Sequence, residues 1–294
     1  MQIEKKNWWR KTRLKKFEYS YCKMSTGNWY DSAIEGILLD ITGVLYDSTD
    51  EGGVPIPGSI DAVKRLKGSG IQVRFCTNET QCTRQQLVDK LQRLGFELSV
   101  PEVFAPAPAA CQLLKARGLT PHLLVYPDVL PEFEAFDLGA KPTCVVVGDA
   151  ADVFNYETMN NAFRKLLEMD PPVLISMGAG KYYRHGTELM LDVGPFTKAL
   201  EYAVRCEAVV VGKPDKNFFL GALQDMGIQP QNAIMIGDDI VNDVGGAQRC
   251  GLRGLQVRTG KFRPSDEHHS EVKPDGFVDN LAQAVDLLLQ HQKK

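Results

Sequence analysis

The sequence predicts an α/β fold: a doubly wound parallel sheet with an inserted, smaller α/β domain. Two observations predict this fold. From residue 34 onward, short apolar or β-branched runs alternate with amphipathic helical stretches, which is typical of βα units on a parallel sheet. After residue 104 a Pro- and Ala-rich junction leads into a second set of elements, and the first pattern resumes near residue 195.

The first βα unit opens the predicted core. Residues 37–39 form an apolar run typical of a buried strand. After a Gly- and Pro-rich stretch, Ser59 is predicted to be the N-cap residue of a helix. The spacing of Ile60, Val63 and Leu66 would place these side chains on one buried face of that helix.

The second βα unit follows directly. Residues 71–76 alternate in the manner of a strand. Thr83 and Gln86, three residues apart, form the signature of a capping box, so a helix is predicted to begin there. Gly95 is predicted to end that helix.

The middle block, residues 105–194, carries enough elements for a domain of its own. Its predicted elements are helices near 109–117 and 158–168 and strands at 122–126, 143–148 and 173–177. We therefore expect it to be an inserted α/β domain between two halves of the core.

The last third of the chain is predicted to return to the core sheet. Its predicted elements are a helix that starts at Gly194 and Pro195, strands at 209–211, 233–236 and 254–257, and a closing amphipathic helix over 281–289. The core is thus expected to comprise residues 34–104 and 195–294.

Composition excludes several classes of protein. With 44% hydrophobic and 24% charged residues, the chain has the composition of a globular protein rather than a disordered one. Its apolar runs fall far short of the roughly 20 residues that a membrane-spanning helix needs. A net charge of −3 gives no overall electrostatic reason to bind nucleic acid. We expect neither nucleic acid nor a membrane as a partner.

The seven cysteines are odd in number, scattered and without a CxxC pair. This pattern predicts neither a disulfide framework nor a zinc site. Reduced thiols favour a cytoplasmic or nuclear address over secretion.

Residues 1–33 are predicted to be a basic N-terminal extension. The first 30 residues hold eight Lys and Arg residues against Glu4 and Glu18. No uninterrupted apolar stretch marks a secretory signal. Met24 precedes Asp40 by 16 residues and is expected to be the usual start. The alternative is a targeting arm or an arm that binds an anionic surface.

Four short segments that follow predicted core strands carry chemically active side chains. They are Asp40, Ile41 and Thr42; Thr77 and Asn78; Lys213; and Asp238, Asp239 and Asp243. Because ligands of open parallel sheets bind outside the carboxyl ends of the strands, these segments are expected to form one site. Carboxylates with a lysine and a hydroxyl-amide pair suit a phosphoryl group and a hard divalent cation.

In this order and spacing, the four segments resemble the signature motifs of the haloacid dehalogenase superfamily, which has a Rossmann-like core. The resemblance covers nearly all of the chain from about residue 34 to the end. The resemblance implies that Asp40 is a nucleophile that forms a phospho-aspartyl intermediate and binds Mg²⁺. It implies that the Thr42 carbonyl and Asp238 also bind the metal. Thr77 and Asn78 would bind the phosphoryl oxygens.

The resemblance assigns further roles. Ile41, Thr42 and Lys213 would contact the substrate, with Lys213 offsetting charge between nucleophile and phosphate. Asp239 and Asp243 would orient the Lys213 ammonium or metal-bound waters. The inserted block stands where the NagD-like branch of the superfamily carries its type-II cap.

Thr42 departs from the usual pattern. Most phosphatases of this superfamily carry an aspartate two residues after the nucleophile, where it protonates the leaving group. A threonine hydroxyl has no useful acidity near neutral pH, so general acid catalysis of typically about 10²- to 10⁴-fold is missing from this position. The leaving groups of pyrophosphate, acyl phosphates and P–N bonds depend less on a general acid than those of alkyl phosphomonoesters. These compounds are therefore the expected substrates.

A narrower resemblance agrees with this expectation. The strings LLDITGVLYD, VRFCTNETQ, VVVGKP and MIGDDIVNDVGGAQRCG look like those of a cytosolic and nuclear branch of the family. The resemblance implies a Mg²⁺-dependent, homodimeric hydrolase. Its substrates would be phosphohistidine, phospholysine and inorganic pyrophosphate, in phosphorylated proteins or small molecules.

Three other readings stay open. The first is a capped phosphatase of a small phosphomonoester, against which Thr42 argues. The second is a non-catalytic signalling module with a phospho-accepting aspartate, but such modules have only about 120 residues and no inserted domain. The third is an inactive scaffold, which the intact Asp40, Lys213 and Asp238 disfavour.

Overall fold

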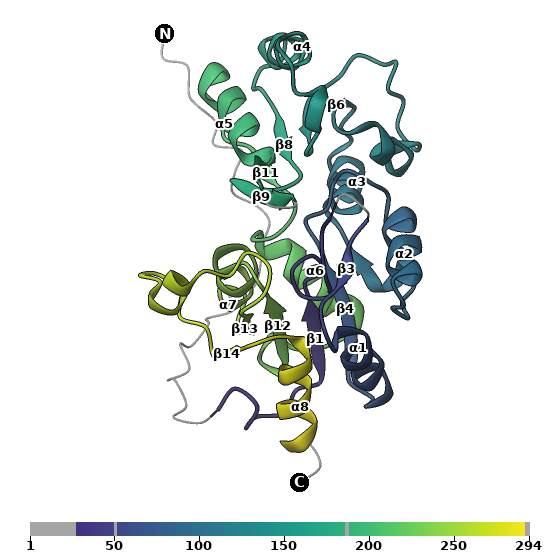
Figure 1. Ribbon diagram of the computed structural model, residues 1–294. Coiled ribbons are helices and arrows are strands. Elements are labelled where there is room, and N and C mark those ends of the chain that lie inside the picture. Colours follow the sequence, from purple (N-terminus) through teal and green to yellow (C-terminus); the bar gives the residue numbers. More distant parts are fainter. Residues whose placement is uncertain (1–27, 50–51, 186–187, 292–294) are drawn as a thin grey trace, which may run out of the picture.

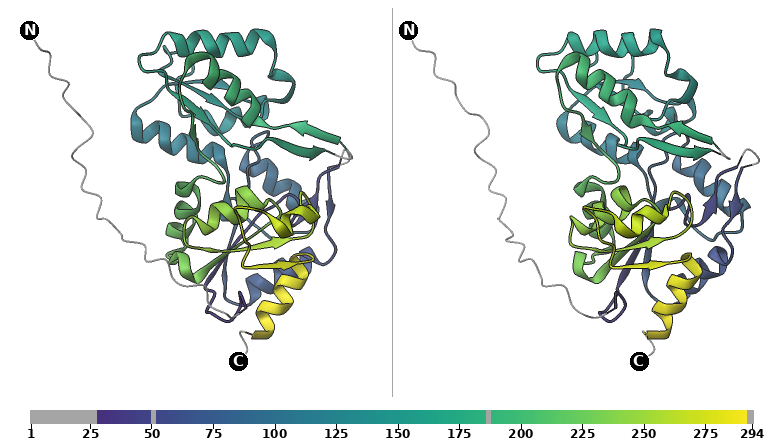
Figure 2. Two further views of the ribbon diagram at one scale, coloured as in Figure 1. Left: turned by 90° about the vertical axis from the view of Figure 1, so that its left-hand side faces the viewer. Right: turned by 60° about the vertical axis from the view of Figure 1, so that its left-hand side comes forward.

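The computed structural model describes residues 28–49, 52–185 and 188–291 of the chain (Figure 1). The structure consists of two neighbouring α/β units, a core and a cap, each with its own parallel sheet (Figure 2). Predictions that concern residues 1–27, including the start at Met24 and the thiol of Cys22, lie outside the described residues.

The core is built on a six-stranded, all-parallel sheet with the order β14-β13-β12-β1-β4-β5. Its strands are β1 (Gly36–Leu39), β4 (Gln72–Cys76), β5 (Val103–Phe104), β12 (Ala233–Gly237), β13 (Arg253–Val257) and β14 (Gly276–Val278). The strands predicted around residues 37–39, 71–76, 233–236 and 254–257 are confirmed. The predicted α/β fold class, with a parallel sheet in the core, is confirmed as well.

Helices cover both faces of this sheet, and its neighbouring strands β1 and β12 are accordingly apolar. Successive residues of a strand point to opposite faces: in β1, Ile37 and Leu39 enter one core cluster and Leu38 enters the other. The first face is covered by α1 (Ser59–Gly68), α2 (Arg84–Arg93) and α8 (Leu281–His291), and the second by α6 (Lys216–Met226) and α7 (Gly246–Gln248).

The two predicted helix starts had different outcomes. Thr83 and Gln86 form a complete capping box at α2, as predicted. The prediction for α1 was wrong: its N-cap residue is Gly58, whose positive φ of 80° favours glycine. The Ser59 hydroxyl is buried and donates a hydrogen bond to the carbonyl of Leu45 at 2.8 Å. Val63 and Leu66 are buried as predicted, but Ile60, which was placed on the same face, is exposed.

The cap has its own four-stranded parallel sheet, with the order β11-β8-β7-β6. Its strands are β6 (Pro121–Leu124), β7 (Cys144–Val147), β8 (Leu174–Ser176) and β11 (Val209–Val210). Helix α3 (Pro106–Arg117) packs on one face, and α4 (Tyr156–Leu167) and α5 (Val193–Val204) pack on the other.

The return from cap to core comes later in the chain than predicted. β11 was predicted to join the core sheet, but it pairs with β8 of the cap. Helix α5 also packs in the cap, where Val193 and Leu200 share a core cluster with Val145 and Val147 of β7. A β-branched run predicts a buried strand without saying which sheet will pair with it, and this explains the error. The predicted limit at residue 195 therefore divides elements that pack together.

Two antiparallel pairs and several short helical turns complete the fold. The pairs are β2 (Tyr46–Asp47) with β3 (Val54–Pro55) in the core, and β9 (Tyr182–His185) with β10 (Glu188–Leu191) in the cap. The 3-10 turns are Val100–Glu102, Pro127–Phe133, Ala151–Val153, Pro230–Asn232 and Pro264–His268, and Ile240–Gly245 is a π-helical turn. The β9–β10 pair reaches out of the cap on one side of the molecule (Figure 2).

The last residues of the predicted N-terminal extension belong to the core. Trp29 is buried and packs against Gly276, where a Cβ would overlap the indole ring. Tyr30 stacks on His291 of α8 with the ring centroids 4.1 Å apart. Arg253 donates hydrogen bonds to the carbonyls of Trp29, Ser32 and Ala33. The predicted limit at residue 33 is therefore too late.

Two further expectations concern the described residues. The six cysteines in this part of the chain are all free, as expected for reduced thiols. Within the same residues, no helix has the length and apolar character needed to cross a bilayer.

Candidate active site

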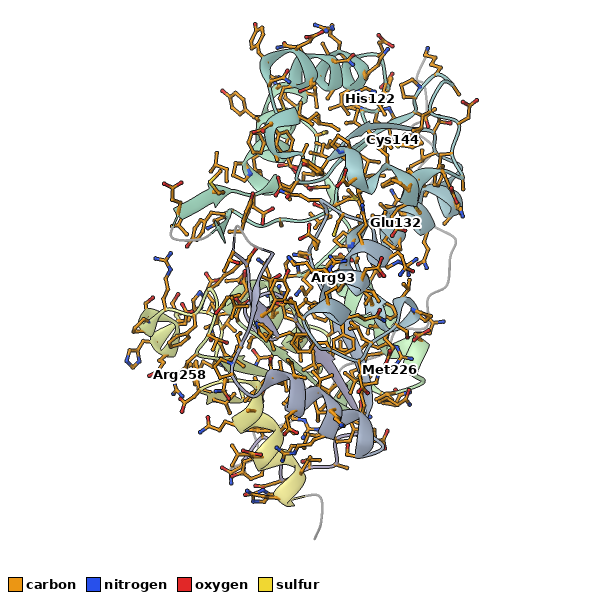
Figure 3. The ribbon with its side chains drawn as sticks, turned by 45° about the vertical axis from the view of Figure 1, so that its right-hand side comes forward. Arg93, His122, Glu132, Cys144, Met226 and Arg258 are labelled. Carbon is orange, nitrogen blue, oxygen red and sulfur yellow. The ribbon has the colours of Figure 1, made fainter. Side chains whose placement is uncertain are left out.

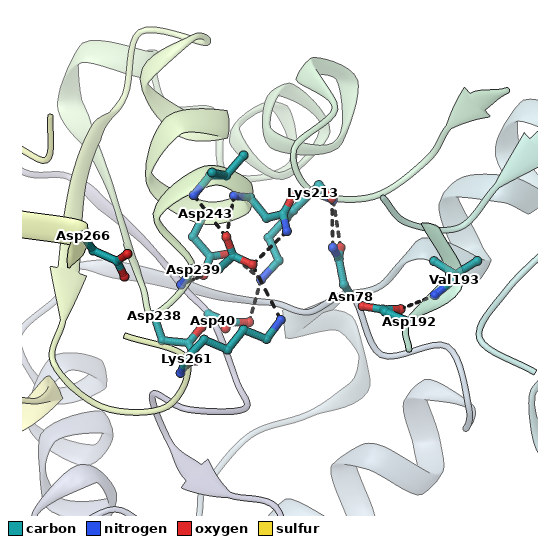
Figure 4. Close-up of polar contacts among 12 residues, drawn as sticks. Asp40, Asn78, Asp192, Val193, Lys213, Asp238, Asp239, Asp243, Lys261 and Asp266 are labelled. Carbon is teal, nitrogen blue, oxygen red and sulfur yellow. Dashed lines mark hydrogen bonds and ion pairs between the residues drawn. The ribbon is translucent and has the colours of Figure 1, made fainter. Parts of the chain in front are cut away.

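The carboxyl ends of β1, β4 and β12 meet the segment after β11 in a cleft of about 490 Å³ between core and cap. Figure 4 shows the polar contacts that join Asp40, Asn78, Lys213 and Asp243 there. The predicted residues that line it are Asp40, Thr42, Thr77, Asn78, Lys213, Asp239 and Asp243. Asp238 is buried beside them. Ile41 differs, because its side chain is buried in the apolar core. Only the backbone of Ile41 is available for the predicted contact with a substrate.

Lys213 is the buried centre of the site. Its ammonium donates to Asp40 Oδ1 at 2.6 Å and to the Cys76 carbonyl at 2.8 Å, and it lies 2.8 Å from Asp243 Oδ1. These three partners match the three N–H groups of the ammonium. Burial opposes the charged form, but the charges of Asp243 and Asp40 outweigh it and raise the pKa of Lys213. Lys213 therefore stays charged and fixes Asp40.

Asn78 holds the backbone of Lys213 in place. The Asn78 side chain donates to the Lys213 carbonyl at 2.9 Å and accepts from the Lys213 backbone N–H at 2.8 Å. Both bonds occupy the amide group that was predicted to bind phosphoryl oxygens, which leaves one Nδ2 hydrogen for that purpose. Thr77 accepts a hydrogen bond from the Glu79 backbone at 3.0 Å, so its hydroxyl proton is available to a ligand.

The carboxylates of Asp40, Asp238 and Asp243 have oxygens within 4.8 Å of one another, all from buried residues. Oδ1 of Asp238 is buried and has no hydrogen-bond partner among the described residues. The other oxygen lies between Gly43 and Gly260, where a Cβ on either residue would overlap it. Both glycines have a positive φ, so the backbone on both sides is shaped around this carboxylate.

This triad fits a metal ion. Burial and the nearby charge of Asp40 raise the pKa of Asp238 well above its usual range. Burial likewise raises the pKa of Asp243 to about 7, although Lys213 opposes the rise. Three buried carboxylates that repel one another are stabilised by a divalent cation with oxygen ligands. The unpartnered oxygen of Asp238 gives such an ion a ligand.

Asp239 lines the cleft as predicted, but it does not contact Lys213, which was one of its two predicted roles. Its carboxylate accepts from the backbone N–H groups of Val241 and Asn242, and it faces Lys261 at 3.6 Å rather than Lys213. These bonds place it at the start of the π-helical turn that carries Asp243. Burial opposes ionisation, but Lys261 and the two N–H groups lower the pKa of Asp239.

Lys261 is a site residue that the sequence analysis missed. Its backbone N–H donates to Asp238 Oδ2 at 2.8 Å, and its side chain lines the cleft. Burial lowers its pKa, but the charges of Asp238 and Asp239 outweigh this effect and the pKa is raised. Lys261 lies in an irregular segment after β13, where no periodic pattern indicates which side chain faces the site.

Tyr46 and Lys90, which lie near Thr42, are two further site residues that the sequence analysis missed. The Thr42 hydroxyl donates to Tyr46 Oη at 3.4 Å, and the ammonium of Lys90 donates to the same oxygen at 3.1 Å. The ammonium also lies 4.5 Å from the centre of the Tyr46 ring. Tyr46 and Lys90 both line the cleft. On the sequence, Lys90 is only a polar residue in the helix α2.

The cap closes the cleft from above. Asp149, which follows β7, accepts a hydrogen bond from Gln81 at 2.7 Å, and its backbone N–H donates to the Thr80 hydroxyl at 2.9 Å. Burial raises the pKa of Asp149 to about 6. Away from the cleft, Glu132 of the cap, labelled in Figure 3, lies near the start of α2. It accepts a hydrogen bond from the backbone N–H of Arg84 at 2.9 Å.

Comparison with known proteins agrees with the geometry. A haloacid dehalogenase-like hydrolase model matches residues 37–139, and a HAD-hydrolase-like model matches residues 210–284. A relative from Homo sapiens, named phospholysine phosphohistidine inorganic pyrophosphate phosphatase, is 62% identical over 263 residues, which cover 90% of this chain and 97% of the relative. The chain belongs to the haloacid dehalogenase-like hydrolases.

Solved structures share the arrangement of core and cap. A 4-nitrophenylphosphatase from Thermotoga maritima superposes with a TM-score of 0.79 at 24% identity, covering 89% of this chain and all of that one. NagD from E. coli K-12 superposes with a TM-score of 0.75 at 20% identity, covering 86% and 98%. The predicted NagD-like haloacid dehalogenase fold is therefore confirmed.

Proposed function

We propose that the protein is a phosphatase that hydrolyses the P–N bonds of phosphohistidine and phospholysine and also inorganic pyrophosphate, through a phospho-aspartyl intermediate. The observation that carries the proposal is the position of Thr42, which stands in the cleft where an acid would serve the leaving group. The name of the 62% identical human relative supports these substrates.

The proposed reaction begins at Asp40. One of its oxygens forms a bond to phosphorus while the bond from phosphorus to the leaving group breaks, and the electron pair departs with the leaving group. A protonated nitrogen or a phosphate accepts that pair without an added proton. Lys213 keeps Asp40 in place and offsets negative charge, and Thr77 has a hydroxyl proton for a phosphoryl oxygen.

The second half of the reaction returns the enzyme to its starting state. The oxygen of a water molecule forms a bond to phosphorus, and the bond between phosphorus and Asp40 breaks with its electron pair on the carboxylate. The phosphate leaves with the water oxygen and its protons. The Asp40 carboxylate then accepts a hydrogen bond from the Lys213 ammonium again.

Mg²⁺ is the cation we propose for the buried triad. Asp40 and Asp238 would bind it, and the carbonyl of Thr42 is proposed as a further ligand. When bound, such an ion supplies positive charge beside the transferring phosphoryl group. The carboxylate of Asp243 forms an ion pair with Lys213 at 2.8 Å. This ion pair supports a role for Asp243 in orienting the lysine, in addition to any role in binding the metal.

The test is phosphate release from pyrophosphate, phosphohistidine, phospholysine and several alkyl phosphomonoesters, with and without Mg²⁺. Asp40→Asn serves as the blank, and Asp61→Asn, on the exposed side of α1, is the matched control. We expect Mg²⁺-dependent release from the first three substrates in the wild type and the control. Equal or faster release from the monoesters would reject the substrate assignment, and release by Asp40→Asn would reject the nucleophile.

On the sequence resemblance we also propose a homodimer with a cytoplasmic or nuclear location and a phosphorylated protein or small molecule as substrate. Light scattering of the purified protein tests the dimer, and a monomer at micromolar concentration would reject it.

A further inference from the structure

The cleft contains three lysines, and their partners differ. Lys213 is paired with Asp40 and Asp243, and Lys261 faces Asp239. Lys90 forms no ion pair with a carboxylate within the described part of the chain; its ammonium donates to the neutral hydroxyl of Tyr46. The carboxylates of the site therefore leave the charge of Lys90 available for an anion.

The position of Lys90 indicates where that anion would lie. Thr42 occupies the place of the acid that serves the leaving group in related phosphatases. Its hydroxyl and the Lys90 ammonium both donate to Tyr46 Oη, at 3.4 Å and 3.1 Å. Lys90 thus reaches the leaving-group side of Asp40, whereas Lys213 contacts Asp40 itself.

Tyr46 fixes the direction of the lysine. Tyr46 is 2% exposed, and the Lys90 ammonium contacts both its hydroxyl and its ring, 4.5 Å from the centroid. Lys90 is only partly buried, and it lines the cleft together with Asp40 and Thr42. A long side chain that is anchored in this way loses less rotational freedom when it binds a ligand.

We propose that Lys90, positioned by Tyr46, forms a binding site for a second phosphate group, the leaving phosphate of pyrophosphate. This inference rests on the proposed function and divides its substrates into two classes. In pyrophosphate the bridging P–O bond breaks, and its electron pair stays on the bridging oxygen of the departing phosphate. Lys90 donates a hydrogen bond to that phosphate. Phosphohistidine and phospholysine carry no second phosphate and do not use this lysine.

The experiment compares Lys90→Met and Lys90→Arg with the wild type on three substrates. Pyrophosphate has a second phosphate, phosphohistidine has a P–N bond, and imidodiphosphate has both. A charged hydrogen bond of this kind corresponds to about 10- to 100-fold in kcat/KM. We expect Lys90→Met to lose that factor on pyrophosphate and imidodiphosphate but less than about 2-fold on phosphohistidine. Lys90→Arg should recover most of the loss, because it restores the cation.

Binding gives a second readout. Calorimetry with methylenediphosphonate, which has two phosphorus groups and no cleavable bridge, should show weaker binding to Lys90→Met, while methylphosphonate should bind both proteins alike. Tyr46→Phe, which removes the hydroxyl, should lose part of the same selectivity. Lys64→Met, an exposed lysine on α1, is the control and should change nothing.

Either of two results would overturn the inference. Lys90→Met could slow all three substrates equally, which indicates a structural effect, or it could slow none of them. If the wild type releases no phosphate from pyrophosphate or phosphohistidine, the proposed function fails, and the methylenediphosphonate comparison still tests whether Lys90 binds a second phosphate.

Discussion

The ammonium of Lys213 lies 2.6 Å from Oδ1 of Asp40, and both side chains are buried at the floor of the cleft. Lys213 is also paired with Asp243, so it neutralises a part of the charge of two carboxylates at once. Asp40 must carry a negative charge to attack phosphorus, and burial would make that charge costly without the lysine. The pair therefore determines both stability and activity.

Lys213→Met is expected to lower kcat by at least about 10²- to 10³-fold. The free energy of unfolding should also fall by about 3–5 kcal/mol, because the substitution leaves buried carboxylates unpaired. Denaturant unfolding and steady-state phosphate release measure the two effects. Lys64→Met, at an exposed position, should be unchanged in both, and a fully active Lys213→Met would contradict the role of the ion pair.

Thr42→Asp places a carboxyl group where the leaving group departs. We expect it to raise kcat/KM for an alkyl phosphomonoester by at least about 10-fold, since a general acid typically contributes more than this. Thr42→Asn has nearly the same shape and no acidic proton, so it is the matched control. If both variants hydrolyse the ester at the wild-type rate, the missing acid does not restrict the substrates.

Much of the core was predictable because chemistry and position coincide there. Asp40, Thr77, Asn78 and Asp238 each follow a buried strand, and the parallel sheet brings these strand ends together. The apolar runs that predicted the strands reflect burial on both faces of the sheet.

The parts that sequence reasoning missed depend on long-range packing. Lys90 reaches the site from the side of a helix, and Lys261 reaches it from an irregular loop, so neither comes directly after a strand. β11 was assigned to the wrong sheet because its apolar character reports burial and not the pairing partner. Ile60 has the spacing of a buried helix residue and is nevertheless exposed, because spacing alone does not show where the buried face ends.

Divalent cation binding should stabilise the protein through the buried triad. At a Mg²⁺ concentration of 100 times Kd, the gain is about 2.7 kcal/mol, which corresponds to a rise in Tm of several degrees. EDTA should reverse the rise. Asp238→Asn should remove most of it, while Asp61→Asn should retain it. A Mg²⁺-induced rise of full size in Asp238→Asn would show that the cation binds elsewhere.

Asp149 gives the cap a pH-dependent contribution. Its pKa of about 6 in the folded chain lies above the ordinary value of 3.8, so folding favours the neutral form. The stability that this group contributes is complete below about pH 4 and is lost as the pH rises through about 6. Asp149→Asn, which is always neutral, should therefore gain Tm relative to the wild type at pH 7.5 but not at pH 4.

Thermal unfolding of both proteins across this pH range is the measurement. Asp152→Asn, at an exposed position on the same wall of the cleft, is the control and should show no such difference. A constant difference in Tm between Asp149→Asn and the wild type from pH 4 to 7.5 would mean that Asp149 does not titrate in this window.

The contacts of Trp29 and Tyr30 have a practical consequence for protein production. Because Trp29 packs on Gly276 and Tyr30 stacks on His291, the first and last described elements stabilise each other. A chain shortened to begin at Met24 retains both aromatic residues and should fold normally, whereas a chain cut after Tyr30 should aggregate. An affinity tag is better joined through a spacer beyond residue 294 than fused directly to His291, where it would compete with the stacked ring.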